Sequence, residues 1–234
     1  ALKAGNDMVL APRRLKEEMD AVLEAVEKGE LPEEEINAKC RKVLTYKYIL
    51  GLERKPFVKL SGLGTRINTP QTRDLISRLN LAAITVLNNK NDVLPLHPDL
   101  KEAAILNVGK PEEIEPFDRK MKKYTSFARF QLRKDLPEAE QQKLRDSLAA
   151  YRRVIVTVTE QRLAPYQSFF AKFAPESPVI YVFYTPAKSM LQIQRAVSAA
   201  EAVVLAHASR DDVQERVADL LFGKATADGR LSAS

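Results

Sequence analysis

The sequence predicts an α/β fold in which a parallel β-sheet is covered by helices on both faces. From residue 103 onward, short apolar runs alternate repeatedly with helical patterns, and each run is apolar at consecutive positions. Strands of a parallel sheet are buried on both faces, so runs of this kind are typical of them. The composition, with 45% hydrophobic and 29% charged residues in a chain of 234, also allows a well-packed core.

Two amphipathic helices are expected ahead of this region. Apolar residues recur three and four positions apart over residues 13–28 and again over residues 31–50, and Gly29 ends the first of these patterns. The mostly apolar segment Asp7-Met-Val-Leu-Ala is expected to form a short buried strand that ends at Pro12.

Loop-forming residues gather between the two halves of the chain. Glycine and proline are frequent over residues 53–69, which we interpret as a linker and a domain boundary. The Gly-Leu-Gly at 62–64 lies in this linker and does not follow a strand, so it is not interpreted as a phosphate loop. A helix is expected to begin at Pro70 with Thr69 as its N-cap. Residues 84–88 form either a strand or the end of that helix.

Several classes of site and partner are excluded or disfavoured by composition. A single cysteine, Cys40, excludes an internal disulfide and a multi-cysteine zinc site, and its place on an apolar helix stripe predicts a buried, unreactive thiol. No run reaches the roughly 18 apolar residues of a membrane span. The net charge is +6, but basic residues alternate with acids, and the basic run 119–123 is interpreted as a solvated helix face. We therefore expect no nucleic-acid partner, no metal and no cofactor.

Candidate functional residues follow the predicted strands, because open α/β sheets bind ligands at the carboxyl ends of their strands. Glu160 follows one strand directly and is either a catalytic acid or a solvent-facing loop residue. His207 follows the last strand, without a serine or cysteine at nucleophile spacing beside it. Asp211 and Asp212 are interpreted as favourable negative charges at a helix N-terminus.

Four strings in the sequence resemble those of the family 3 glycoside hydrolases, in the order in which that family has them. They are Ala4-Gly-Asn-Asp-Met-Val-Leu, the runs 36–52 and 81–96, and the closing Leu220-Leu-Phe-Gly-Lys-Ala-Thr-Ala-Asp-Gly-Arg-Leu-Ser. The sequence is most similar to the bacterial β-N-acetylglucosaminidase branch. It departs from the family at Ser232, where proline is usual.

The resemblance implies a division of the chain into parts of two domains. Residues 1–52 correspond to the last strand and outer helices of a (β/α)8 catalytic barrel, and residues 53–69 correspond to the linker. Residues 70–234 correspond to a flavodoxin-like α/β sandwich with a mostly parallel sheet. The chain is therefore expected to be the C-terminal portion of a longer, periplasmic or exported protein. Its residues 1–52 are expected to pack on the upstream barrel portion of that parent or to associate.

The resemblance also implies that this chain holds no catalytic residue. Retaining glycosidases need a carboxylate nucleophile and an acid/base. The family's nucleophile lies upstream of the string that contains Asp7, as does the His–Asp acid/base pair of the acetylglucosaminidase branch. In the glucosidase branch, a glutamate of the C-terminal domain is the acid/base. Glu160 is nearest to its place, but the flanking residues differ and the role is not assigned. Asp7 matches an aspartate expected to shape the sugar pocket.

Three functions remain open from the sequence. The first is the C-terminal portion of an exo-acting, retaining glycoside hydrolase whose parent cleaves a β-linked sugar, with N-acetylglucosamine expected. The second is a non-catalytic scaffold, or a module that binds carbohydrate or a partner. The third is a free-standing flavodoxin-like nucleotide binder, against which the missing phosphate loop counts.

Overall fold

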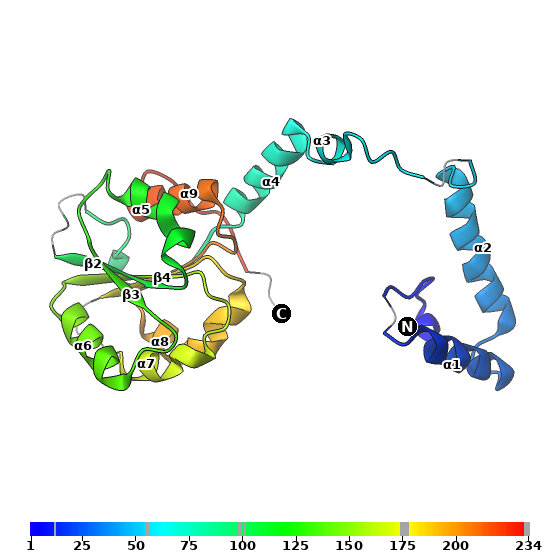
Figure 1. Ribbon diagram of the computed structural model, residues 1–234, viewed down its shortest axis with the longest axis horizontal. Coiled ribbons are helices and arrows are strands. Elements are labelled where there is room, and N and C mark those ends of the chain that lie inside the picture. Colours follow the sequence, from blue (N-terminus) through cyan, green and yellow to red (C-terminus); the bar gives the residue numbers. More distant parts are fainter. Residues whose placement is uncertain (12, 55–56, 98–99, 101, 174–177, 232–234) are drawn as a thin grey trace. The chain divides into compact units, whose positions relative to one another are not determined.

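The chain forms two compact units, Ala1–Ile67 and Asn68–Ser234, each of which is described by itself. The computed structural model describes residues 1–11, 13–54, 57–97, 100, 102–173 and 178–231 (Figure 1). The predictions that fall on Pro12, on part of the linker at residues 55–56, and on Ser232 lie outside the described residues. The assignment of residues 1–52 to a barrel stays a prediction.

The first unit is helical. Its helices are the 3-10 turn Leu2–Ala4, α1 (Leu15–Glu27), α2 (Glu33–Ile49) and α3 (Leu63–Ile67). The helices predicted over 13–28 and 31–50 are confirmed as α1 and α2, and Gly29 takes the left-handed φ of +70° that ends a helix. The short helix α3 lies inside residues that the sequence predicted to be linker.

Two predictions about the first unit are wrong for the same physical reason. Residues 7–11 form no strand, and Leu10 is 92% exposed. Cys40 is exposed rather than buried. A strand needs a neighbour for its backbone hydrogen bonds, and an apolar helix face needs a covering layer. The described residues of this unit supply neither.

The second unit is built on a six-stranded sheet. Its strands are β1 (Thr85–Asn89), β2 (Ala103–Val108), β3 (Ala128–Leu132), β4 (Arg153–Val158), β5 (Val179–Phe183) and β6 (Ala202–Leu205). Their order in the sheet is β1-β6-β5-β4-β2-β3. All neighbouring pairs are parallel except β1, which runs antiparallel to β6 at one edge. The predicted α/β fold with a mostly parallel sheet is confirmed.

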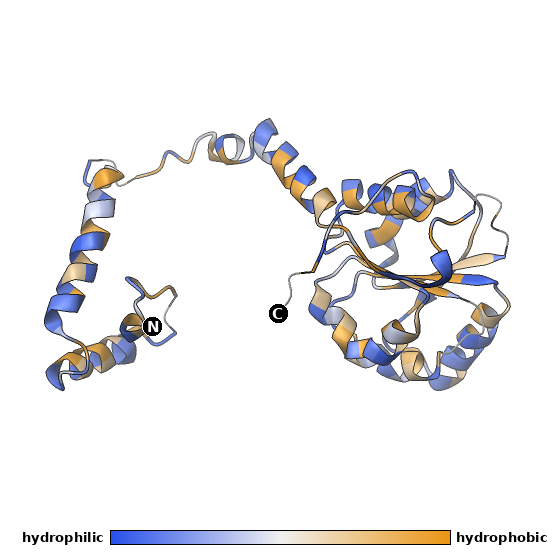
Figure 2. Cartoon of the chain, turned by 180° about the vertical axis from the view of Figure 1, so that it is seen from behind, coloured by the Kyte–Doolittle hydropathy of each residue, from blue (hydrophilic) through white to orange (hydrophobic). Residues whose placement is uncertain are grey.

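Helices cover both faces of this sheet, as Figure 1 shows. The helices of this unit are α4 (Pro70–Ala82), α5 (Glu115–Met121), α6 (Glu138–Ala149), α7 (Gln167–Lys172), α8 (Gln194–Ala199) and α9 (Asp211–Leu221), with 3-10 turns at Lys90–Asp92, Pro111–Ile114, Ala164–Tyr166 and Ala187–Ile193. Helices α6, α7 and α8 pack on one face, and α5 and α9 on the other. The strands are orange along most of their length in Figure 2, in keeping with burial on both faces.

The segment that leads into the sheet resolves an alternative left open by the sequence. Thr69 caps α4 by accepting a 3.1 Å hydrogen bond from the backbone N–H of Thr72. Ser77 of this helix donates a 2.5 Å hydrogen bond to Asp212 of α9. Residues 84–88 then fall mostly in β1 and do not extend the helix.

A row of polar side chains crosses three neighbouring strands near the carboxyl edge of the sheet. Thr157 of β4 donates to Asn107 of β2 (3.2 Å), which donates to Gln131 of β3 (2.9 Å). The Gln131 amide in turn donates to the carbonyl of Gly109 (2.6 Å). Since buried polar groups are costly unless they are paired, this row fixes the register of the strands and the position of Gly109.

Candidate functional site

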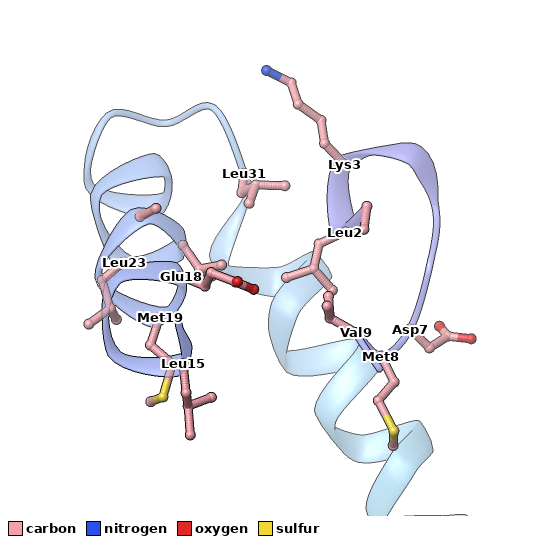
Figure 3. Close-up of a pocket in the computed structure, with 13 residues that line it drawn as sticks. Leu2, Lys3, Asp7, Met8, Val9, Leu15, Glu18, Met19, Leu23 and Leu31 are labelled. Carbon is pink, nitrogen blue, oxygen red and sulfur yellow. The ribbon is translucent and has the colours of Figure 1, made fainter. Parts of the chain in front are cut away.

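Asp7 lies beside an apolar hollow of the first unit. The hollow encloses about 620 Å³, and most of its lining is aliphatic, from residues 1–9, α1 and Leu31. Lys42 of α2 donates a 2.5 Å hydrogen bond to the Asp7 carboxylate and thereby lowers the pKa of Asp7. In Figure 3 this carboxylate points away from the side chains of α1. An aliphatic lining suits the packing of another apolar surface better than proton transfer.

A polar hollow lies at the carboxyl edge of the parallel sheet in the second unit, and we call it the edge groove. It encloses about 530 Å³. Its lining comes from the residues that follow β2, β4, β5 and β6, together with the start of α9: Glu112, Glu113, Pro116, Thr159, Gln161, Tyr184, Pro186, His207, Ala208, Ser209, Asp211 and Gln214. A second hollow of about 360 Å³ shares Glu113, Thr159 and Gln161 with it, so the two are adjacent.

The smaller hollow lies where β2 and β4 are neighbours, at the point where the order of the strands reverses. Ligands of open α/β sheets bind at this switch point. Gly109, at the end of β2, has a φ of +139°, and a Cβ there would lie 1.9 Å from Thr159 Oγ1. One glycine followed by Lys110 and Pro111 makes no phosphate-binding loop. The turn therefore does not support nucleotide binding.

Two glutamine side chains hold the rims of the edge groove. Gln214 of α9 is 1% exposed; its amide donates to the carbonyl of Glu113 (2.8 Å) and to Ser209, and it accepts from the N–H of Phe117 (3.2 Å). On the opposite side, Gln192 accepts from the N–H of Leu163 and donates to the carbonyl of Gln161, both at 2.8 Å. The loops are thus held in place without any ligand.

Replacing Gln214 by leucine is expected to lower the free energy of unfolding by about 2 kcal/mol. It leaves the N–H of Phe117 without the side-chain oxygen to which it donates, and the carbonyl of Glu113 keeps only its hydrogen bond from Ser209 Oγ. Urea unfolding followed by circular dichroism measures the effect. Arg216→Leu, at an exposed position on the same helix, is the matched control and should change the value by less than about 0.5 kcal/mol. Equal stabilities for the two variants would contradict the role given to Gln214.

His207 and Tyr184 are the most unusual residues of the edge groove. His207 has a φ of +62°, and the N–H of Ala208 donates to the carbonyl of Ala206 at 2.7 Å, which closes a γ-turn around it. Tyr184 is 3% exposed, and its hydroxyl has no hydrogen-bond partner among the described residues. Burial raises the pKa of Tyr184 well above its usual range, so the phenol stays protonated.

The acidic candidates are placed as follows. Glu160 follows β4 and is half-buried, and its carboxylate accepts a 3.0 Å hydrogen bond from the N–H of Arg162. It lines the smaller hollow, while Asp211 lines the edge groove. Asp211 and Asp212 both lie in the first turn of α9, as predicted.

The basic run 119–123 belongs to a solvated helix end, where Arg119 forms an ion pair with Glu215 at 3.2 Å.

Metal binding and membrane crossing find no support in the described part of the chain. Its histidine, cysteine and carboxylate side chains form no group of three or more that could hold a metal ion. No helix among these residues is both long and apolar enough to span a bilayer.

Sequence reasoning located one side of the edge groove and missed the rest. His207 and Glu160 were found because each lies two residues beyond the end of a strand, β6 and β4. Tyr184 and Thr159 directly follow strands and could have been found by the same rule. Gln214 gives no signal in the sequence, because it lies in the middle of an amphipathic helix.

Comparison with known proteins gives one match in sequence and several in structure. No protein-family model matches. The chain is 32% identical to a lysosomal beta glucosidase of Dictyostelium discoideum over 107 residues. The aligned part is 45% of this chain and 13% of that protein. The structure is similar to that of beta-glucoside phosphorylase BglX, with a TM-score of 0.64 and 18% identity over 98% of this chain and 43% of that one. It is also similar to a family 3 β-N-acetylglucosaminidase from Paenibacillus sp. str. FPU-7, with a TM-score of 0.60 and 19% identity over 98% of this chain and 45% of that one.

The resemblance to the family 3 glycoside hydrolases is confirmed. The fold is that of the C-terminal portion of these enzymes. The chain spans less than half the length of the solved structures it matches, and about an eighth of the glucosidase. These matches therefore assign no role to Asp7 and no catalytic residue, and both are taken up below as proposals.

Proposed function

We propose that the chain is the C-terminal portion of a retaining, exo-acting family 3 glycoside hydrolase whose parent removes terminal β-linked sugars, with N-acetylglucosamine as the first candidate. The observation that carries this proposal is the likeness to the Paenibacillus β-N-acetylglucosaminidase, which extends over 98% of the chain and so includes both compact units. The nucleophile and the acid/base are contributed by the barrel portion that precedes this chain in the parent. Asp7 helps to shape the sugar pocket.

The exposed apolar surface of the first unit supports a partner of this kind. Large aliphatic and aromatic side chains are exposed along residues 8–10, α1 and α2: Met8, Val9, Leu10, Leu15, Met19, Leu23, Leu44, Tyr46, Tyr48 and Ile49. Exposed apolar side chains in this number are typical of a protein–protein interface. The upstream barrel portion of the same parent is the partner that this surface fits, since a barrel strand and its outer helices bury their apolar residues against their neighbours.

Two chromogenic assays test the proposal. The 234-residue chain alone is expected to leave p-nitrophenyl β-N-acetylglucosaminide uncleaved, because it has no nucleophile in position. The same chain joined to the preceding part of its parent is expected to cleave it, and faster than the corresponding β-glucoside. Turnover by the chain alone would refute the missing nucleophile, and turnover by the joined protein only with inorganic phosphate would make the parent a phosphorylase.

The second candidate is a non-catalytic module that binds carbohydrate or a partner domain. The edge groove favours it, because a polar hollow with fixed rims is present in the second unit itself. The two candidate functions are separated by measuring the binding of chitooligosaccharides to the chain and, in a second titration, the binding of the barrel portion to it. Binding to the sugar alone would favour the module, and binding to the barrel portion would favour the glycosidase.

A further inference from the structure

We propose that residues 223–231, which follow α9, form a strap that holds the end of α4 against the sheet, and that the strap and α4 open together as one local unit. The strap is the red segment after α9 in Figure 1. This inference goes beyond the proposed function and does not rest on it, because every residue involved belongs to the second unit.

The strap begins with a turn that ends α9. Gly223 has a left-handed φ of +69°, and its N–H donates to the carbonyl of Leu220 (3.0 Å). The N–H of Lys224 donates to the carbonyl of Asp219 (2.8 Å). These two bonds form a Schellman motif, in which glycine closes a helix and lets the chain change direction. A Cβ at Gly223 would lie 2.9 Å from Pro95 Cβ, so the turn also packs closely against that proline.

Beyond the turn, alternate residues of the strap face the molecule. Ala225, Ala227 and Gly229 are half-buried, and the residues between them are exposed. Ala225 and Ala227 pack against the apolar layer that lies between the sheet and helices α5 and α9. A period of two is typical of extended backbone with one covered face. Because the covered positions hold only alanine and glycine, the backbone of the strap can lie close to the surface beneath it.

Gly229 connects the strap to the corner between α4 and β1. Its N–H donates to the carbonyl of Ile84 (3.1 Å), two residues beyond the end of α4. A Cβ at this position would lie 2.6 Å from the Ile84 carbonyl oxygen and from Thr85 Oγ1, and 2.7 Å from the Ala83 carbonyl oxygen. Two of these three atoms belong to the backbone and cannot rotate away as the end of a side chain can. A larger residue must therefore lift the strap from the corner or displace the corner itself.

Helix α4 depends on this contact because the helix buries little of its own surface. The structure describes all of its residues, and none of them is buried. Leu75, Ile76 and Leu79 are 47%, 38% and 60% exposed. Ser77 attaches the helix to α9 by its hydrogen bond, and Leu81 packs on the same layer as the strap. Segments with few buried contacts open at a lower free-energy cost than the core, so the strap and α4 can open while the parallel strands remain paired.

Hydrogen exchange of the full chain, followed by NMR, tests the proposal. The Ala83 N–H donates to the carbonyl of Leu79 (3.0 Å) and reports on α4, and the Gly229 N–H reports on the strap. In the unaltered chain, these two groups are expected to have the same free energy of opening and the same small dependence on urea. Both values should be lower than those of the N–H groups in β4, because the urea dependence increases with the surface that an opening exposes.

Two variants connect this opening to the named contacts. Gly229→Ala is expected to speed exchange at the Ala83 N–H at least about tenfold, because the new methyl group prevents the strap from closing on the corner. Ser77→Ala weakens the attachment of α4 to α9. It is expected to speed exchange at Ala83 and at Gly229 by the same factor, since coupling between two sites is reciprocal.

Two controls accompany these variants. Asp228→Ala, at an exposed position on the strap next to Gly229, should change neither rate. Leu144→Ala, on α6 at the opposite face of the sheet, is expected to speed exchange in β4 and to leave Ala83 and Gly229 unchanged, because Leu144 stays packed when the strap opens.

Four results would overturn the proposal. In the unaltered chain, they are different free energies of opening for Ala83 and Gly229, or a single opening shared with β4. In the variants, they are unchanged exchange at Ala83 in a folded Gly229→Ala protein, and an effect of Ser77→Ala on Ala83 alone. If Gly229→Ala does not fold, the unaltered chain and Ser77→Ala still decide. None of these results bears on glycosidase activity, which the chromogenic assays measure separately.

Discussion

Replacing Phe117 by alanine is expected to lower the free energy of unfolding of the second unit by about 4 kcal/mol. Phe117 of α5 is fully buried in the layer between the sheet and helices α5 and α9. Its ring makes an edge-to-face contact with Tyr184 at a centroid distance of 6.1 Å. The substitution leaves a cavity in this close-packed layer, and it removes the support for the tyrosine at the floor of the edge groove.

Urea unfolding followed by circular dichroism measures this loss. The matched control is Phe57→Ala, which removes the same ring from a position that is 89% exposed and should cost less than about 0.5 kcal/mol. A loss below about 1 kcal/mol for Phe117→Ala would mean that this layer is not packed as described. The His207 resonance should also shift in the variant, because the groove floor loses its support.

The sheet of the second unit was predictable because local and tertiary preferences agree there. Val154–Val158 and Val179–Phe183 are β-branched or aromatic at every position, and the structure buries each of these residues. The antiparallel pairing of β1 was not predictable, since residues 84–88 lie next to a helix and their pattern fits either state. The choice comes from β6, whose free edge β1 covers.

In the first unit, the same reasoning overestimated burial. Residues 7–11 have the composition of a strand and Cys40 lies on a helical stripe, but pattern alone does not provide the layer that buries them. Hydrophobic periodicity predicts which face of a segment would be buried. Whether that face is buried depends on another helix or strand that packs against it, which the periodicity of the segment does not reveal. Two amphipathic helices, and a strand-like segment that forms no strand without that layer, are what the proposed barrel origin of residues 1–52 predicts.

The candidate site was predictable only as a location. The rule that ligands bind at the carboxyl ends of parallel strands found Glu160 and His207. It did not find the pairing of Gln214 with Glu113, which joins residues 101 positions apart, or the unpartnered hydroxyl of Tyr184. These features depend on how side chains fill three-dimensional space, and a linear pattern does not contain that information.

Gly109→Ala is expected to destabilise the second unit by about 4 kcal/mol, from two effects that add. A φ of +139° is strained for any residue with a Cβ, and the added methyl group would lie 1.9 Å from Thr159 Oγ1 and 3.2 Å from the backbone nitrogen of Glu160. Neither neighbour can move freely, because the N–H groups of Thr159 and Glu160 both donate to the carbonyl of Val108. Urea unfolding measures the loss.

A double variant separates the two effects. Thr159→Ala removes the oxygen that the new methyl group would meet, so Gly109→Ala/Thr159→Ala should recover the steric part and keep the backbone strain. Gly64→Ala, where a Cβ would meet no atom within 4 Å, is the control; it lies in α3 and should be neutral or stabilising by up to about 1 kcal/mol. If Gly109→Ala were as stable as Gly64→Ala, the close approach of β2 and β4 at the switch point would be wrong. Full recovery in the double variant would instead mean that the backbone at Gly109 relaxes, so that the steric contact alone requires glycine at the junction of the two hollows.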